Sequence, residues 1–140
     1  MGELHGENCV TLRTSIIGHE LQGHHGLVDW FLRAESPTEG YTKAIFSGLT
    51  TYELSRVIEK FVLPNDALRG LWHVSAEPIS KYDLVSLLNR VYGKKTDIRK
   101  NYSVILDRSL DSTRFRAATG YIPSSWLNMV ETMHKMEGKQ

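Results

Sequence analysis

The feature that most constrains the fold is the alternation of β-branched apolar runs with segments of helical periodicity. The runs CVTLRTSII and LRGLWHVS, residues 9–17 and 68–75, have the composition of buried strands. After the second run, apolar residues recur at helical spacing through residues 81–93, behind Ser80 as a capping residue and Asp83 three positions later. Strands that alternate with helices predict an α/β fold.

The remaining segments extend the same pattern. YTKAIFSG, residues 41–48, predicts a short strand, and TDIRKNYSVILDR, residues 96–108, predicts a strand with a loop. Apolar spacing and capping residues predict further helices near residues 27–32, 51–63, 110–120 and 124–136. Pro37 and Gly40 predict a turn. The positions of Trp30, Trp72 and Trp126 beside apolar residues favour core packing over ligand contacts. We expect short strands alternating with about five helices.

The composition is that of one soluble globular domain and excludes several classes of protein. The 140 residues include 17 basic and 16 acidic side chains mixed along the chain, which gives no electrostatic reason to expect nucleic acid or an anionic membrane as a partner. No apolar stretch approaches the ~18 residues of a membrane span, and MGELHGEN lacks the apolar region of a signal peptide. The single cysteine, Cys9, lies in an apolar run, which favours a packing role and a cytoplasmic location.

The segment GHELQGHHG, residues 18–26, concentrates three of the six histidines. A zinc-protease helix needs two histidines one helical turn apart, but His19 and His24 would lie roughly 140° apart around a helix. Gly23 also weakens a helix here. A phosphate-binding loop needs lysine and serine or threonine after its second glycine, and this segment has two histidines there. We therefore expect a loop without a metal site.

The sequence contains no complete catalytic set. It has no G-x-G-x-x-G dinucleotide fingerprint, no C-x-x-C pair and no G-x-S-x-G nucleophile elbow. No tyrosine is followed four residues later by a lysine, whose charge would lower the pKa of the phenol for acid–base work. We therefore assign no catalytic residue to this chain.

Three phrases resemble the second half of extended short-chain dehydrogenases/reductases that act on nucleotide sugars. VTLRTSIIG resembles the strand and loop that follow the catalytic Y-x-x-x-K helix of that family. GLWHVSAEPISKYDLVSLL resembles its strand and serine-capped helix. DRSLDSTRFRAATGYIPSSW resembles its short helix, glycine and tryptophan-led last helix. The order of the phrases is closest to dTDP-4-dehydrorhamnose reductases and their epimerase and dehydratase relatives.

The resemblance implies that residues 1–140 form the C-terminal, substrate-binding lobe of such an enzyme, with a partial Rossmann-type fold. The cofactor loop and the Tyr/Lys pair would then belong to an N-terminal half, so NAD(P) is implied for the intact enzyme and is not expected to bind this chain alone. The expected ligand is a nucleotide-diphosphate sugar used in polysaccharide precursor biosynthesis. The alternative is a non-catalytic interaction or regulatory module. Apolar surface facing the other half also predicts a homo-oligomer.

The resemblance also implies candidate site residues. Thr14 and Ser15 would face the nicotinamide and the sugar with hydroxyl donors, or would only end a strand. His19, His24 and His25 would contact sugar hydroxyls or the pyrophosphate, or would be solvated. Arg108 would bind the diphosphate, because a guanidinium forks onto phosphate oxygens. The alternative for Arg108 is a surface ion pair with Asp107 or Asp111.

Overall fold

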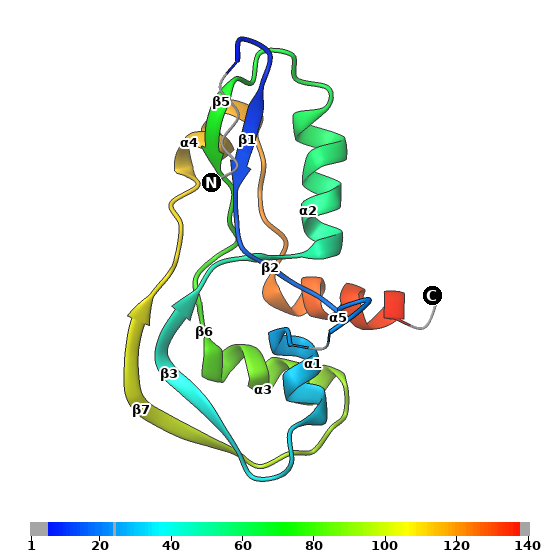
Figure 1. Ribbon diagram of the computed structural model, residues 1–140, viewed down its shortest axis with the longest axis vertical. Coiled ribbons are helices and arrows are strands. Elements are labelled where there is room, and N and C mark those ends of the chain that lie inside the picture. The colour runs from blue at the N-terminus through cyan, green and yellow to red at the C-terminus, as the bar shows by residue number, and fades with distance from the viewer. Residues whose placement is uncertain (1–5, 24, 138–140) are drawn as a thin grey trace.

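The computed structural model describes residues 6–23 and 25–137 and has two parts stacked along its long axis (Figure 1). One part contains the parallel pair β1 and β5 with helices α2 and α4, and the other contains α1, α3 and the strands β3 and β7 (Figure 1). The helices are α1 (Leu27–Arg33), α2 (Thr51–Val57), α3 (Lys81–Val91), α4 (Thr113–Thr119) and α5 (Trp126–Glu137), and a π-helical turn η1 (Ile58–Val62) extends α2. The expected α/β fold with five helices is confirmed.

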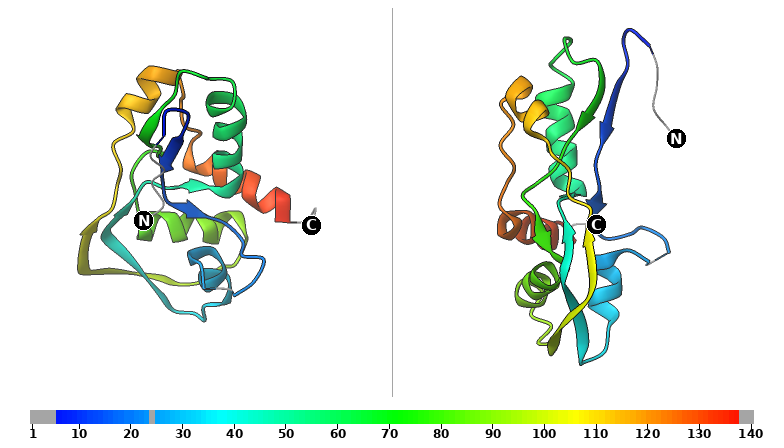
Figure 2. Two further views of the ribbon diagram at one scale, coloured as in Figure 1. Left: turned by 45° about the horizontal axis from the view of Figure 1, so that its top comes forward. Right: turned by 90° about the vertical axis from the view of Figure 1, so that its left-hand side faces the viewer.

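The strands form three small sheets. Strand β1 (Val10–Arg13) pairs in parallel with β5 (Gly70–His73), and β2 (Ile16–Ile17) pairs in parallel with β4 (Leu49–Thr50). The third sheet has the order β6–β3–β7, in which β3 (Thr38–Phe46) is antiparallel to β6 (Ile79–Ser80) and parallel to β7 (Ile98–Asp107). Helices α1 and α3 lie on opposite sides of the β3–β7 pair (Figure 2).

Each part has its own hydrophobic core, and α5 contributes to both. One core gathers buried side chains from β4, α2, β5 and α4, with Met129 of α5. The other gathers buried side chains from β2, α1 and α3, with Val130 and Met133 of α5. Trp126 is partly buried and packs against both cores. Helix α5 therefore lies where the two parts meet (Figure 1).

Local sequence signals fix several helix ends as expected. The hydroxyl of Thr50 accepts a hydrogen bond from the amide of Glu53 at the start of α2, and Ser80 accepts one from Asp83 at the start of α3. Gly120 ends α4 with a φ of 73°, a left-handed conformation that glycine adopts without steric cost. Ser125 caps α5 through the amide of Asn128.

The chain bends at Ser36 and Pro37, as predicted, but the expected turn does not extend to Gly40, which lies inside the nine-residue strand β3. A Cβ atom on Gly40 would lie 2.8 Å from Cδ2 and 2.9 Å from Cα of Tyr82 at the start of α3. The glycine therefore marks the point where α3 packs directly on the strand. The expected strand and loop at residues 96–108 form one long strand, β7.

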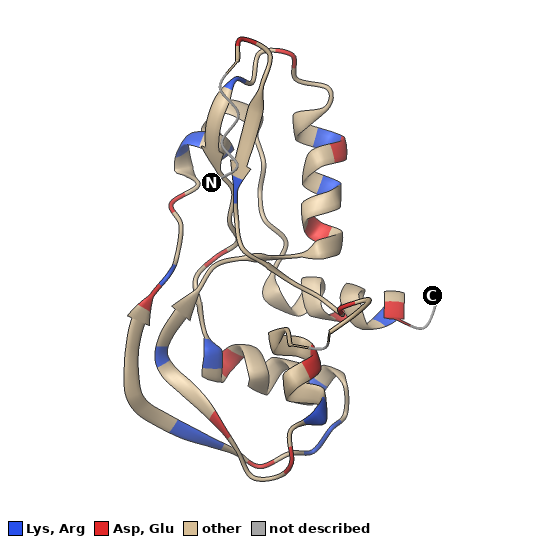
Figure 3. Ribbon diagram, viewed as in Figure 1, with Lys and Arg blue, Asp and Glu red and all other residues tan. Residues whose placement is uncertain are grey.

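Acidic and basic side chains are interspersed over the ribbon, as the mixed composition predicts (Figure 3). Across the part of the chain that the structure describes, there is no helix of the length and apolarity that a bilayer crossing requires.

Candidate functional site

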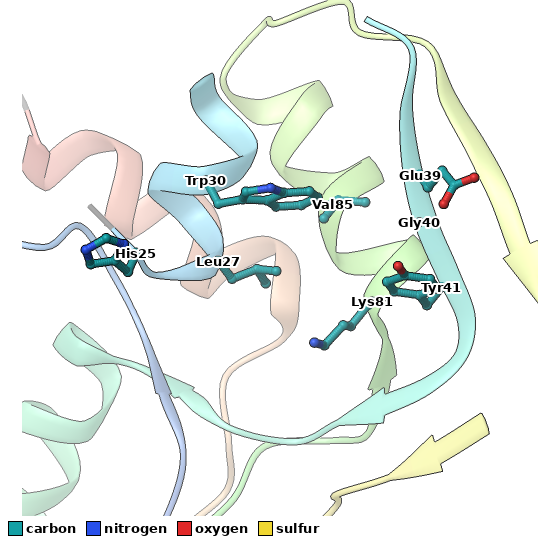
Figure 4. Close-up of a pocket in the computed structure, with 8 residues that line it drawn as sticks. All are labelled: His25, Leu27, Trp30, Glu39, Gly40, Tyr41, Lys81 and Val85. Carbon is teal, nitrogen blue, oxygen red and sulfur yellow. The ribbon is translucent and has the colours of Figure 1, made fainter. Parts of the chain in front are cut away.

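A pocket of about 310 Å³ opens between α1, β3 and the start of α3. Figure 4 shows its lining residues on these three elements and on the segment just before α1. The wall combines aromatic, apolar and charged groups, which are His25, Leu27, Trp30, Glu39, Gly40, Tyr41, Lys81 and Val85.

A second pocket, of about 230 Å³, adjoins the first and shares Leu27 and Lys81 with it. Its lining includes Ser15, from the link between β1 and β2, and Arg108, just after β7. The rest of its wall is mainly apolar and comes from Ile16, Ile17, Ala44, Ile45, Phe46, Leu84 and Leu106. We call the two pockets together the Lys81 groove. It has two cationic side chains over an apolar floor.

Lys81 occupies the first position of α3, directly after the capping residue Ser80. A helix N-terminus carries a partial positive charge, so a lysine there is electrostatically unfavourable unless an anion lies nearby. Lys81 lines both pockets of the groove, so its ammonium group and the end of the helix act on the same space.

Backbone contacts fix Ser15 and Arg108 in the second pocket. The carbonyl of Ser15 accepts a hydrogen bond of 2.8 Å from the amide of Leu49. A Cβ atom on Gly48 would lie 2.4 Å from that carbonyl, so this close approach requires glycine. The amide of Arg108 donates to the carbonyl of Ile45 over 3.1 Å, which continues the β3–β7 pairing by one residue.

Each acidic neighbour of Arg108 uses its Oδ1 atom in a local turn. The carboxylate of Asp107 accepts hydrogen bonds from the hydroxyl and amide of Ser109, and these bonds lower its pKa. Asp111 accepts a hydrogen bond from the amide of Thr113, and its contacts with Thr113 lower its pKa in the same way. Among the residues that the structure describes, Arg108 makes no ion pair with either carboxylate.

The core position expected for Trp30 is wrong, because this side chain is 45% exposed and lines the first pocket. Val28 and Phe31 are fully buried, and Trp30 lies roughly 200° and 100° from them around the helix. The indole is therefore directed to the other side of the short helix α1. The core positions expected for Trp72 and Trp126 agree with the structure, since Trp72 is buried and Trp126 packs against both cores.

The structure brings three of the six predicted site residues to this groove. Ser15 and Arg108 line the second pocket, and His25 lines the first. Thr14 is half-buried between β1 and β2, its hydroxyl donates to the carbonyl of Ser15, and it lines neither pocket of the groove. His24 lies outside the described residues.

The Gly/His segment is a loop over its described residues, as predicted. The carboxylate of Glu20 accepts a hydrogen bond of 2.8 Å from the amide of His25, and the amide of Glu20 donates to Asp29 of α1 over 2.9 Å. The ring of His19 contacts Tyr92 and not the groove. Within residues 6–23 and 25–137, no group of three or more His, Cys, Asp or Glu side chains could hold a metal ion.

Lys81, Trp30 and Tyr41 are the groove residues that the sequence did not reveal as site residues. A lysine that opens a helix is most simply interpreted as solvated, so Lys81 gave no signal in the sequence. Tyr41 gave no signal, because an aromatic residue in a strand is ordinary.

Comparison with known proteins gives a match in structure alone. No protein-family model matches the sequence. No curated protein matches it either. Among solved structures, dTDP-4-dehydrorhamnose reductase from Bacillus anthracis, in complex with NADP, aligns over 93% of this chain and 49% of its own, with a TM-score of 0.71 and 17% identity.

Two further solved structures extend the match to related enzymes. The dTDP-glucose 4,6-dehydratase from Bacillus anthracis, in complex with NAD, covers 94% of this chain and 44% of its own, with a TM-score of 0.68 and 12% identity. The enzyme WbmG from Bordetella bronchiseptica, in complex with NAD and UDP, covers 93% and 43%, with a TM-score of 0.70 and 13% identity.

The chain therefore spans about half the length of the solved structures that it matches. At these identities the match establishes the fold and not the activity. The resemblance seen in the three sequence phrases is thus confirmed in three dimensions: this chain has the fold of about half of an extended short-chain dehydrogenase/reductase of the nucleotide-sugar group.

Proposed function

We propose that this chain is the substrate-binding lobe of an NAD(P)-dependent sugar-nucleotide reductase or epimerase, and that the Lys81 groove binds a nucleotide-diphosphate sugar. The observation that carries the proposal is the pairing of Lys81 and Arg108 in one pocket that continues into an aromatic wall. A diphosphate needs cations, and a base or sugar ring needs an apolar face, and the groove offers both side by side.

In this proposal the second pocket holds the diphosphate. Arg108 offers a planar fork of donors to phosphate oxygens, and Lys81 adds a compact charge at the positive end of α3. The hydroxyl of Ser15 in the same pocket adds a donor for a phosphate or sugar oxygen. A dianionic ligand here would also interact favourably with the positive end of α3.

The first pocket would take a ring. Trp30 and Tyr41 give it two aromatic side chains, and Leu27 and Val85 complete the apolar part of its wall. Glu39 accepts a hydrogen bond of 2.8 Å from the side-chain amide of Asn101 on β7, and Figure 4 shows its carboxylate directed to that side of β3. The solved WbmG structure, with UDP bound in a similar fold, supports this choice of ligand class.

The hydride chemistry of such an enzyme is not assigned to this chain. The sequence has neither a G-x-G-x-x-G turn nor a Y-x-x-x-K pair, the two motifs that this chemistry needs. The NAD and NADP complexes among the structural neighbours support NAD(P) as the cofactor of the intact enzyme. A regulatory module built on the same fold would keep the groove and lose its ligand affinity.

The test is calorimetric titration of the chain with dTDP- and UDP-sugars and, separately, with NADPH. We expect saturable binding of a nucleotide sugar and none of NADPH. Lys81→Met and Arg108→Gln should each weaken nucleotide-sugar binding by about 10- to 100-fold, because hydrogen bonds to charged groups contribute ~1.5–3 kcal/mol. Lys60→Met, an exposed lysine on η1, is the matched control and should leave the affinity unchanged.

Two results would overturn the proposal. One is equal affinity of the wild-type chain and the Lys81→Met and Arg108→Gln variants, which would place the ligand elsewhere. The other is the absence of binding to every nucleotide sugar at millimolar concentration, which would favour the regulatory module.

A further inference from the structure

Two of the glycines in the Gly/His segment, residues 18–26, lie against the carboxylate of Glu20. A Cβ atom on Gly26 would lie 2.8 Å from Oε1 of this side chain, and one on Gly23 would lie 3.3 Å from Oε2. Gly23 also has a φ of 101°, a backbone conformation that strains a residue with a side chain. The loop therefore leaves room for the Glu20 side chain at two places where another residue would crowd it.

Glu20 also holds two later points of the chain by hydrogen bonds. Its Oε2 atom accepts from the amide of His25 over 2.8 Å, and its own amide donates to Oδ2 of Asp29 in α1 over 2.9 Å. Glu20 is partly buried, which strengthens these bonds relative to bonds in open solvent. One residue thus closes the loop and fastens it to the helix that follows.

Helix α1 begins directly after this loop and has no side-chain cap of its own. Its N-cap residue is Gly26, which offers no side-chain acceptor to the first amides of the helix. The Glu20 carboxylate lies beside Gly26 and brings a negative charge to the positive end of the helix, where it is favourable. Glu20 therefore stabilises the start of α1 as well as the loop.

The residues that Glu20 holds belong to one end of the Lys81 groove. His25, which it binds directly, and Trp30, in the helix that it anchors, both line the first pocket, and neither lines the second. Arg108 lines only the second pocket and is held there by its backbone bond to β3. The loop therefore acts on the first pocket and leaves the cation of the second in place.

We propose that Glu20 is a positioning residue for the first pocket of the Lys81 groove: it holds His25 and the start of α1, and so sets the wall that receives the ring of the ligand. The inference rests on the proposed function, which assigns the ring to the first pocket and the diphosphate to the second. Glu20 acts through the loop and does not touch the ligand. Its removal therefore weakens the binding of a ligand with a ring and spares the binding of a bare diphosphate.

The experiment titrates the chain by calorimetry with UDP-glucose, which would fill both pockets, and with inorganic pyrophosphate, which would fill only the second. Glu20→Ala removes the acceptor of the His25 amide. Glu20→Gln removes the same charge and keeps an oxygen that accepts from this amide. The change in the electrostatic field over the groove is thus the same in both variants, so their difference reports the hydrogen bond.

We expect Glu20→Ala to bind UDP-glucose about three- to tenfold more weakly than Glu20→Gln, as for the loss of one hydrogen bond. The two variants should bind pyrophosphate equally. Without any ligand, the indole NMR signal of Trp30, assigned with Trp30→Phe, should shift in Glu20→Ala and stay near its wild-type position in Glu20→Gln. Glu59→Ala, at an exposed glutamate on η1, is the matched control and should change none of these measurements.

Equal UDP-glucose affinity of Glu20→Ala and Glu20→Gln would overturn the inference. A loss of UDP-glucose and pyrophosphate binding together in Glu20→Ala would also overturn it, because a general loss of structure would then explain the result. If UDP-glucose does not bind the wild type, the proposed function fails. In that case, or if only pyrophosphate fails to bind, the Trp30 signal decides the role of Glu20: a shift confined to Glu20→Ala supports the inference, and an unmoved signal refutes it.

Discussion

Replacement of Glu53 by glutamine is expected to destabilise the chain more than any comparable surface change. The Glu53 carboxylate is buried in α2 and accepts five hydrogen bonds. Oε1 accepts from Nη2 of Arg56 at 2.7 Å, the hydroxyl of Tyr121 at 2.9 Å and the amide of Ser124 at 3.2 Å. Oε2 accepts from Nε of Arg56 at 3.1 Å and the hydroxyl of Ser124 at 3.1 Å. One carboxylate thus ties α2 to the segment that leads into α5.

The magnitude follows from what the substitution removes. All of these partners are donors, so the NH₂ group that takes the place of one carboxylate oxygen in Glu53→Gln would face donors, and Arg56 would lose its counter-charge. Hydrogen bonds to a charged group contribute ~1.5–3 kcal/mol each, and breaking a buried ion pair by removing one partner costs ~3–5 kcal/mol. We therefore expect Glu53→Gln to lower the free energy of unfolding by about 3–5 kcal/mol, out of a total of ~5–15 kcal/mol for a domain.

The assay is urea denaturation followed by far-UV circular dichroism at pH 7. With a denaturant slope of ~1–3 kcal/mol/M, the midpoint should fall by at least ~1 M. Glu59→Gln, an exposed glutamate on η1, is the matched control and should shift the midpoint little. A Glu53→Gln midpoint within experimental error of Glu59→Gln would refute the reasoning.

The same carboxylate gives a pH signature. Burial by itself raises the pKa of Glu53, but hydrogen bonds from Arg56, Ser124 and Tyr121 outweigh it, so the pKa lies below its ordinary value. A lowered folded-state pKa means that the stabilisation is complete above the unfolded-state value of about 4.3 and is lost as the pH falls through the folded-state value. Wild-type stability should therefore drop steeply below about pH 4, and Glu53→Gln should lack that part of the drop.

Two further predictions concern packing. Lys94 donates from Nζ to the carbonyls of Phe31 at 2.7 Å and Leu32 at 2.8 Å and so caps the C-terminus of α1. Lys94→Met should therefore lower the free energy of unfolding, measured by urea denaturation, by about 1–3 kcal/mol. Lys135→Met is the control and should change it little. Gly40→Ala would place a methyl group against Cα of Tyr82, a backbone atom that cannot easily move. The substitution should lower the free energy of unfolding by about 1–3 kcal/mol. An unchanged melting midpoint would show that α3 shifts freely on β3.

The parts of the fold that the sequence predicted are those with a local cause. Ser80, Thr50 and Gly120 act on their own helix ends, so their residue types were sufficient to place α3, α2 and the end of α4. The turn expected at Gly40 failed because the reason for that glycine is Tyr82, a residue distant in sequence that packs against it. Close packing between distant segments leaves no local signal.

The candidate site likewise contains residues that the sequence analysis predicted and residues that it did not. The resemblance to nucleotide-sugar enzymes pointed to Ser15, His25 and Arg108, and the structure brings all three to the Lys81 groove. The sequence analysis wrongly assigned Trp30 to the core. Apolar residues flank it in the seven-residue helix α1, so their spacing does not show which side of the helix faces solvent. The sequence could not assign Lys81 to the site, because Lys81 lines the groove only through the packing of β3 and α1 near the start of α3.

The position of α5 has a consequence for how the chain folds as it is synthesised. Because Met129 belongs to one core and Val130 to the other, neither core is complete until this helix has left the ribosome. Until then, part of the apolar surface of α2 and α3 stays uncovered. Trp126 packs against both cores and donates from its indole to the carbonyl of Glu77 over 2.7 Å, so we expect the two parts to reach their native state as one cooperative unit.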